Sequence, residues 1–154
     1  MKIRQASQTD FETILALKLK SKQEQRKWNN SILPVKSVTR IYKEYLRKDF
    51  SDDWRSVFLA VEDTEIAGMI IGKIYRSLRV VGFERIGHIS NLYVTKKYRR
   101  TKVAQKLVAR LNSWFKSKKA HKVSLELYEK NLPAIRLYRK LGFKTYSIKM
   151  HKKI

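Results

Sequence analysis

The sequence contains no cysteine, only two prolines and five glycines, and only 13 acidic residues against 36 lysines and arginines. Without cysteine, the chain has no disulfide framework, no thiolate metal site and no thiol nucleophile. The scarcity of glycine and proline excludes a flexible linker or a low-complexity tract. The longest apolar run, around residues 67–74, is too short to span a membrane, and the first residues lack the apolar segment of a signal peptide. These absences predict a cytoplasmic protein.

Hydrophobic residues make up 43% of the 154 residues, enough for a single domain over residues 1–154 with one sizeable core. The formal net charge of +23 is extreme for this length. It points to anionic partners such as nucleic acid, ribosomes, an anionic membrane surface or a polyanionic cofactor. The alternative is a solvated lysine-rich surface without a specific partner.

Hydrophobic periodicity predicts a mixed α/β domain. Strands are expected at residues 2–5, 57–62, 66–75, 86–95, 123–128 and 143–150. Helices are expected from a Thr9–Glu12 capping box to about residue 28, then around 38–46, 103–115 and 133–141. A basic loop separates the strands at 66–75 and 86–95. The resulting order, β-α-α-β-β-β-α-β-α-β, places antiparallel hairpins before one β-α-β unit.

The stretch from Val94 to Ala104 is the first candidate site. A predicted strand ends there, a loop carries Arg99, Arg100 and Lys102, and a helix begins. Unpaired N–H groups and the partial positive charge at a helix N-terminus favour anions, phosphates above all. The alternative is a solvated basic loop in front of a helix. Dinucleotide-binding, P-loop and serine-hydrolase motifs are absent, and the three histidines lack metal-ligand spacing.

A second motif follows about thirty residues later. Asn131 is followed by Ala134, Tyr138 and Gly142-Phe143. Together with the basic loop and the order of elements, it resembles the GNAT superfamily of N-acetyltransferases over nearly the whole chain. Residues 87–94 and 124–127 are similar to the branch that acetylates ribosomal-protein and other protein N-termini. The resemblance implies a mixed, mostly antiparallel sheet that splays open between residues 86–95 and 122–128, with helices on both faces.

The resemblance also implies acetyl-CoA as cofactor and assigns roles to residues. Strand residues Leu92, Tyr93 and Val94 would pair with the pantetheine arm, and Asn131 and Ala134 would also contact the cofactor. The pyrophosphate would lie at the loop and helix start, formed by Arg99, Arg100, Thr101, Lys102, Val103, Ala104 and Gln105. Tyr138 would be the general acid beside the sulfur, and His88 or Glu126 would be the base.

Each catalytic candidate has a structural alternative. Tyr138 could be a core residue of its helix, and Glu126 could be a solvated residue on the polar face of its strand. His88 is expected to share a strand face with Ile86, Ser90 and Leu92, where a packed histidine is common. Its unperturbed pKa of about 6.5 suits a base near neutral pH. Because the chain has no cysteine, direct transfer to the amine is simpler than transfer through a covalent thioester intermediate on the enzyme.

Two departures from the family pattern accompany the resemblance. The loop has Lys102 where the family has a glycine whose backbone approaches the phosphates at any φ. The hairpin with which N-terminal acetyltransferases cover their peptide groove is not expected after Phe143. The acceptor is therefore a protein or peptide N-terminus, a lysine or a small amine. The competing hypothesis is a basic homologue without catalysis that binds RNA or ribosomes. A monomer and a homodimer are both compatible with the sequence.

Overall fold

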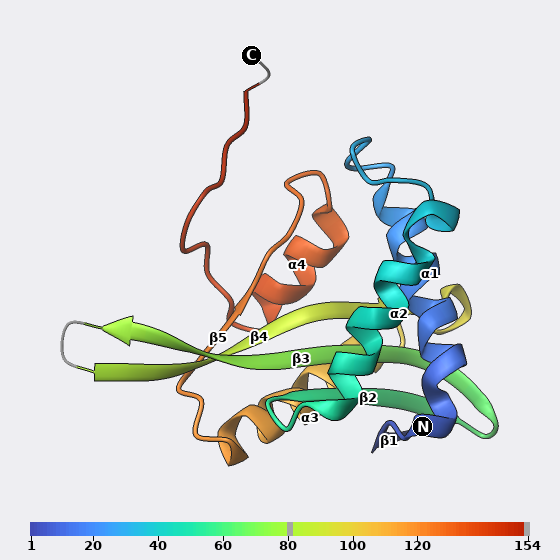
Figure 1. The fold of residues 1–154 in the computed structure, drawn as a ribbon, viewed down its shortest axis with the longest axis horizontal. Coiled ribbons are helices and arrows are strands. Elements are labelled where there is room, and N and C mark those ends of the chain that lie inside the picture. The colour runs from blue at the N-terminus through green and yellow to red at the C-terminus, as the bar shows by residue number, and fades with distance from the viewer. Residues whose placement is uncertain (80–81, 153–154) are drawn as a thin grey trace.

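One five-stranded sheet, in the order β1-β2-β3-β4-β5, organises the protein (Figure 1). The structure is a computed structural model and describes residues 1–79 and 82–152. The strands are β1 (Lys2–Gln5), β2 (Arg55–Glu62), β3 (Glu65–Arg79), β4 (Gly82–Val94) and β5 (Lys122–Leu125). Neighbours pair antiparallel except β4 and β5, which are parallel because a helix crosses between them. The mixed, mostly antiparallel sheet is confirmed.

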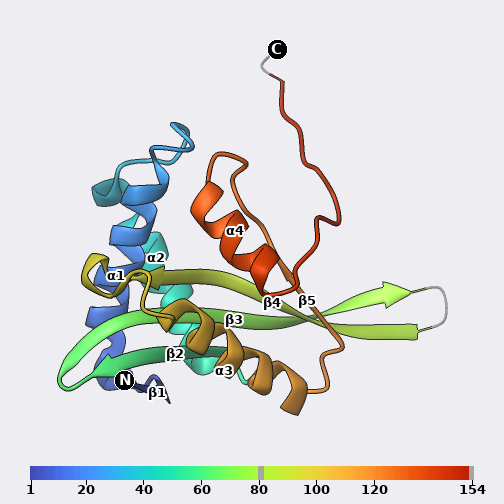
Figure 2. The same ribbon diagram turned by 180° about the vertical axis from the view of Figure 1, so that it is seen from behind.

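Helices cover both faces of the sheet. The first face carries α1 (Phe11–Gln25) and α2 (Val35–Ser51), and the opposite face carries α3 (Val103–Ser117) and α4 (Leu132–Lys140) (Figures 1 and 2). Single 3-10 turns at Gln8–Asp10 and Lys96–Tyr98 precede α1 and α3. Among the described residues, no helix has the length and apolar character to cross a membrane.

Alternation along the central strands divides the core in two. On the α1–α2 side, Leu59, Met69 and Ile71 pack with Ile14 and Leu46. On the α3–α4 side, the strands contribute Phe58, Ile70, Ile74 and Ile89, which pack against Val103, Leu107, Val108, Leu111, Phe115 and Tyr138. All of these side chains are buried. Buried side chains thus recur every second residue along the strands and about every 3.6 residues along the helices. They pack the sheet between two helical layers in one three-layer domain.

Two glycines let α3 lie close to the sheet. A Cβ on Gly72 would come within 2.6 Å of the Leu111 side chain, and one on Gly87 within 2.7 Å of the Phe115 ring. Any other residue at these positions would therefore force the Leu111 and Phe115 side chains, or α3 itself, to shift.

The first helix begins differently from the prediction. The Ser7 N–H donates to the Asp10 carboxylate at 2.8 Å, and Arg4 binds the same carboxylate through two bonds of 2.7 Å. The prediction of a capping box at Thr9 and Glu12 is therefore wrong, and Ser7 and Asp10 form it. Asp10 fills that role because it is the acid that reaches both the turn and β1, and these contacts hold its pKa well below its usual range.

The β3–β4 hairpin is longer than predicted. Residues 76–79 continue β3, and residues 82–85 begin β4. The expected basic loop is therefore largely strand, because cross-strand pairing continues through polar residues such as Arg76↔Arg85 and Ser77↔Glu84. Val80 and Val81, part of that expected loop, lie outside the described residues.

The last predicted strand, residues 143–150, is wrong. Phe143 packs edge-to-face on Tyr138, with ring centroids 5.3 Å apart, but Tyr146, Ile148 and Met150 are 82–101% exposed. A strand needs a neighbour for its backbone groups, and the described residues offer this segment none. Similarly, β5 ends at Leu125 rather than near Tyr128.

Candidate functional site

Strands β4 and β5, the last two strands of the sheet, separate partway along β4. Their pairing covers only Ile86↔Lys122 to Ile89↔Leu125, whereas β4 continues to Val94. Beyond Ile89, β3 pairs with one edge of β4 and no described strand pairs with the other. This splayed opening gives Leu92, Tyr93 and Val94 a free edge that can accept an extended chain by backbone hydrogen bonds.

A β-bulge at the opening changes the faces of β4. Ile71 pairs with Asn91 and Gly72 with Ile89, so Ser90 is the extra residue. Leu92 consequently packs in the α3–α4 core, and Asn91 faces α1, where it donates to Ser21. His88 lies on the α1 side because its neighbour Gly87 faces Phe115. The predicted common face of His88 and Leu92 is therefore wrong.

The loop before α3 has an unusual backbone. Arg100 and Lys102 adopt positive φ values of 69° and 65°, and Thr101 Oγ1 donates to the Tyr98 carbonyl at 2.6 Å. Lys102 is the N-cap, makes no side-chain cap bond, and is followed by a first turn without acidic residues. Val103 is buried, while Ala104 and Gln105 are half-buried. This arrangement leaves first-turn N–H groups available to an anion.

Arg99 points away from that helix end. Its guanidinium makes two bonds of 2.8 and 2.9 Å to Glu24 on α1, and its Nε donates to the Val94 carbonyl at 3.1 Å. The Tyr93 hydroxyl also donates to Glu24, at 3.0 Å. Arg99 thus ties the loop before α3 to α1, and its guanidinium does not lie over the first turn of α3.

Asn131 begins α4. Its Oδ1 accepts a hydrogen bond of 3.3 Å from the Ala134 N–H. This bond satisfies one of the free donors of the helix and positions the whole of α4. Ala134 packs against the α3–α4 core. The structure therefore gives both residues a local structural role beside any contact with a cofactor.

Tyr138 lies on the inner face of α4 and is 5% exposed. Burial raises the pKa of its phenol well above the usual value near 10. Its ring rests on Phe143, and no described protein group hydrogen-bonds its hydroxyl. The phenol therefore remains protonated at physiological pH and has a proton to donate.

On the other face, three side chains from three strands form a hydrogen-bonded cluster. His88 Nδ1 lies 3.1 Å from Ser124 Oγ on β5, and the Tyr75 hydroxyl of β3 lies 3.3 Å from the same oxygen. The Tyr75 ring also meets the imidazole edge-on. Ser124 Oγ donates its proton to the Gly87 carbonyl at 3.3 Å, so the Nδ1–H of His88 donates to Ser124 Oγ and Nε2 is the nitrogen left to accept a proton.

Electrostatics keep His88 neutral. Burial lowers the pKa of the imidazole, the charge of Lys73 lowers it further, and the charge of Glu126 opposes both. Glu126 follows β5 and is exposed. A half-buried neutral imidazole can act as a proton acceptor at pH 7, and the nearby carboxylate can stabilise the imidazolium once it forms.

The proposed acid and base thus lie on opposite faces of the sheet. Tyr138 belongs to the α3–α4 layer, whereas His88 and Glu126 belong to the α1–α2 side. The splayed opening is where the two faces can meet. Sequence reasoning missed Ser124, Tyr75, Lys73 and Glu24 as parts of this site. Only Ser124 left a signal, since it lies two residues from Glu126 on the same strand face.

Comparison with known proteins identifies the family of this chain. Residues 22–143 match the acetyltransferase (GNAT) family. The N-alpha-acetyltransferase of Sulfurisphaera tokodaii is 28% identical over 156 residues, covering 97% of this chain and 84% of that protein.

Solved structures share the fold. A variant of the protein BH1408 from Bacillus halodurans has a TM-score of 0.89 at 18% identity, covering 100% of this chain and 99% of that one. The enzyme AAC(6')-Iy, in complex with a bisubstrate analogue that contains CoA, has a TM-score of 0.74 at 19% identity, covering 99% and 97%. The chain therefore belongs to the acetyltransferase (GNAT) family and is an acetyltransferase that uses acetyl-CoA.

Proposed function

We propose that the protein transfers the acetyl group of acetyl-CoA directly to a primary amine bound on the α1–α2 side of the opening. The observation that carries this proposal is that a protonated phenol on α4 and a neutral imidazole on β4 lie on opposite faces of the sheet, and that β4 and β5 stop pairing one residue beyond the imidazole. Acetyl-CoA supplies an acyl group already activated as a thioester. The chain has only to position the reactants and move two protons.

The residues present fit the cofactor. The free edge of Leu92, Tyr93 and Val94 would hold the pantetheine arm, and the N-terminal turn of α3 would hold the pyrophosphate. Lys102 adds a positive charge at that turn. The loop therefore offers backbone donors and a cation to the same anion.

Each proton has a carrier in the chain. His88 Nε2 accepts the proton that the amine must lose, with Ser124 fixing the ring and Glu126 stabilising the charge. Tyr138 donates a proton to the sulfur as the carbon–sulfur bond breaks and the carbon–nitrogen bond forms. With no cysteine in the sequence, both substrates bind before the transfer.

Among primary amines, we favour the α-amino group of a peptide. The relative from Sulfurisphaera tokodaii is named an N-alpha-acetyltransferase and matches almost the whole chain. Three tyrosines lie close enough to interact electrostatically: Tyr42 and Tyr45 of α2, and Tyr128, which follows β5. The Asn29 side chain donates a hydrogen bond of 3.4 Å to the Tyr128 hydroxyl. These groups offer apolar surface and hydrogen bonds to the residues that follow a peptide N-terminus.

The test is acetyl transfer to three acceptors: unblocked peptides, the same peptides with blocked N-termini and an internal lysine, and small amines. We expect a mass increase of one acetyl group on unblocked peptides, intersecting initial-rate lines and a rise in melting temperature with acetyl-CoA. Transfer to lysine or small amines alone would refute the peptide acceptor. Parallel initial-rate lines would refute direct transfer. No transfer and no thermal shift would refute the enzyme function.

A further inference from the structure

The positive charge of this protein is distributed unevenly. Residues 96–154 hold 19 of the 36 lysines and arginines but only two of the 13 acidic residues, a formal charge of +17 out of +23. This part of the chain builds α3, β5 and α4. The charge is therefore concentrated on one part of the fold, not spread over a lysine-rich surface.

Helices α3 and α4 lie on the same side of the sheet (Figure 2). Neither helix contains an acidic residue. We call their exposed cations the basic surface: Lys106, Arg110, Lys116, Arg136, Arg139 and Lys140. Within residues 1–79 and 82–152, none of the six forms a salt bridge, whereas most acids of the N-terminal half are paired.

The cofactor does not account for this surface. The proposed pyrophosphate site uses only the first turn of α3, whereas the helix continues to Ser117, about 20 Å along its axis. Lys116 lies at that far end. Most of the basic surface is therefore free for a second, extended polyanion.

The segment after α4 adds an aromatic side chain to this region. It leaves the fold beside α4 (Figures 1 and 2), and Tyr146 is 101% exposed between Lys144 and Lys149. Unpaired bases stack on aromatic rings while their phosphates follow a positively charged groove. Acyl chains of a membrane would instead require a continuous apolar face, and most exposed positions of α3 and of α4 are polar or basic.

We propose that the basic surface binds the phosphate backbone of a single-stranded nucleic acid and that Tyr146 stacks on one of its bases. The density of unpaired cations supplies affinity, and the exposed ring distinguishes unpaired bases from a simple polyanion. The interaction goes beyond acetyl transfer and does not depend on it.

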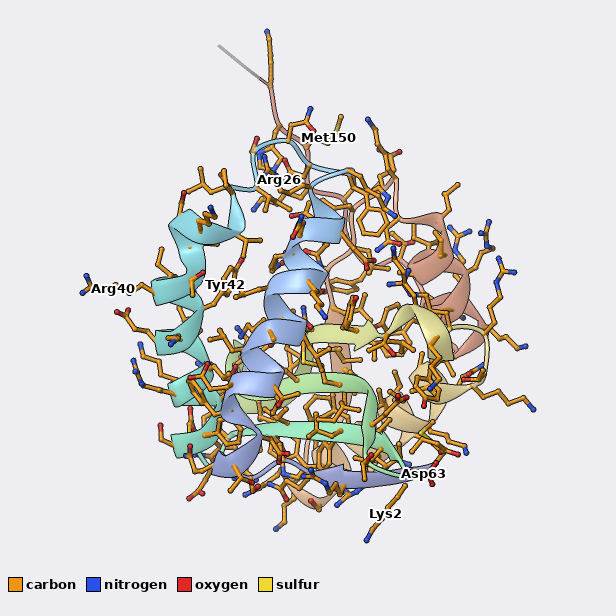
Figure 3. The ribbon with its side chains drawn as sticks, turned by 90° about the vertical axis from the view of Figure 1, so that its right-hand side faces the viewer. Lys2, Arg26, Arg40, Tyr42, Asp63 and Met150 are labelled. Carbon is orange, nitrogen blue, oxygen red and sulfur yellow. The ribbon has the colours of Figure 1, made fainter. Side chains whose placement is uncertain are left out.

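The test is binding of a fluorescein-labelled 20-nucleotide single-stranded RNA, followed by polarisation from 50 to 400 mM salt. In the surface variant, Lys116, Arg136, Arg139 and Lys140, which lie outside the first turn of α3, are replaced by Gln. In the control variant, four exposed cations from α2 and the end of α1 are replaced by Gln: Arg26 (labelled in Figure 3), Lys36, Arg47 and Lys48. Both variants lose four charges, so both have the same net charge.

We expect the surface variant to lose at least about tenfold in affinity at 100 mM salt. Its slope of log affinity against log salt should fall by about 2 to 3, since each lost phosphate contact in a single strand contributes about 0.7. The control variant should bind within about threefold of wild type. Tyr146→Ala should weaken binding about tenfold, and Tyr146→Phe, which keeps the ring, should not.

Equal losses in the two quadruple variants would show that net charge alone drives binding and would overturn the proposal. So would tighter binding to phosphatidylserine vesicles or to polyglutamate than to the RNA. An unchanged melting-temperature rise with acetyl-CoA in both quadruple variants establishes that they are folded. Binding to RNA is measured without acetyl transfer, so failure of the proposed function and failure of this inference are distinguishable.

Discussion

The Tyr138 hydroxyl is the smallest group on which the mechanism depends. Tyr138→Phe removes this one proton donor and keeps the ring that packs on Phe143. We expect kcat to fall about 100-fold, within the usual range for a general acid, with the affinity for CoA nearly unchanged. Steady-state kinetics and calorimetry with CoA measure the two quantities. Full activity in the variant would assign Tyr138 to the core alone.

The lowered pKa of His88 predicts the pH profile. The base works when deprotonated, so kcat/KM should rise with pH through a pKa below about 6.5, the usual value for histidine. Lys73→Met removes a charge that lowers this pKa, and should move the acidic limb to higher pH. Glu126→Gln removes a charge that raises it, and should move the limb to lower pH.

Opposite shifts in those two variants would assign the base to His88, and His88→Ala should then abolish the limb. NMR titration of the His88 ring provides a readout independent of turnover. Glu126 is the base if two other results are found instead. Glu126→Gln would lower activity across the whole pH range, and the pKa of His88 measured by NMR would differ from the pKa of the acidic limb.

Lys102 carries backbone strain in the loop before α3. Its φ of 65° costs a non-glycine residue about 1 kcal/mol, and its charge is unfavourable at the positive end of α3. Lys102→Gly should therefore raise the melting temperature by about 2–4 °C. Lys102→Ala is the control, since it removes the charge but keeps the strain. Equal melting temperatures for Gly and Ala would exclude strain as the cause.

At the scale of elements, the link between α1 and the loop before α3 is the feature to test. The structure pairs Arg99 with Glu24, so both residues position the loop. Arg99→Ala and Glu24→Gln should raise KM for acetyl-CoA by similar factors, and the double variant should be no worse than either. An Arg99→Ala effect that is much larger, and that fades at high salt, would instead indicate direct contact between Arg99 and the phosphates.

Elements with local signals were predictable. Apolar residues at helical spacing located α3, and Pro133 and Gly142 bracketed α4. Strand ends were not predictable, because they depend on a neighbour. The same alternating pattern gives a strand at residues 122–125, where β4 provides a partner, and none at 143–150, where no described strand does. The bulge at Ser90 likewise needs both β3 and β4.

At the scale of the whole molecule, residues 145–152 contribute little to the core. All eight are exposed, and the large apolar ones bury almost nothing. Ending the chain after Lys144 should therefore change the melting temperature by less than about 2 °C. Thermal unfolding and light scattering on both forms measure stability and oligomeric state. A large loss of stability, or a dimer that becomes a monomer, would show that this segment has a partner in solution.

The sequence by itself determined the layered α/β domain and the basic loop before α3, and it named Tyr138, His88 and Glu126 as candidates, because periodicity, capping residues and motif spacing are local properties. Only the tertiary structure decided how these parts meet. The divergence of β4 and β5, the bulge at Ser90 and the cluster of His88, Ser124 and Tyr75 join residues far apart in the chain. The same holds for the direction of the Arg99 side chain, which depends on a carboxylate of α1 that lies 75 residues earlier. Such contacts arise from packing, and local spacing does not specify them.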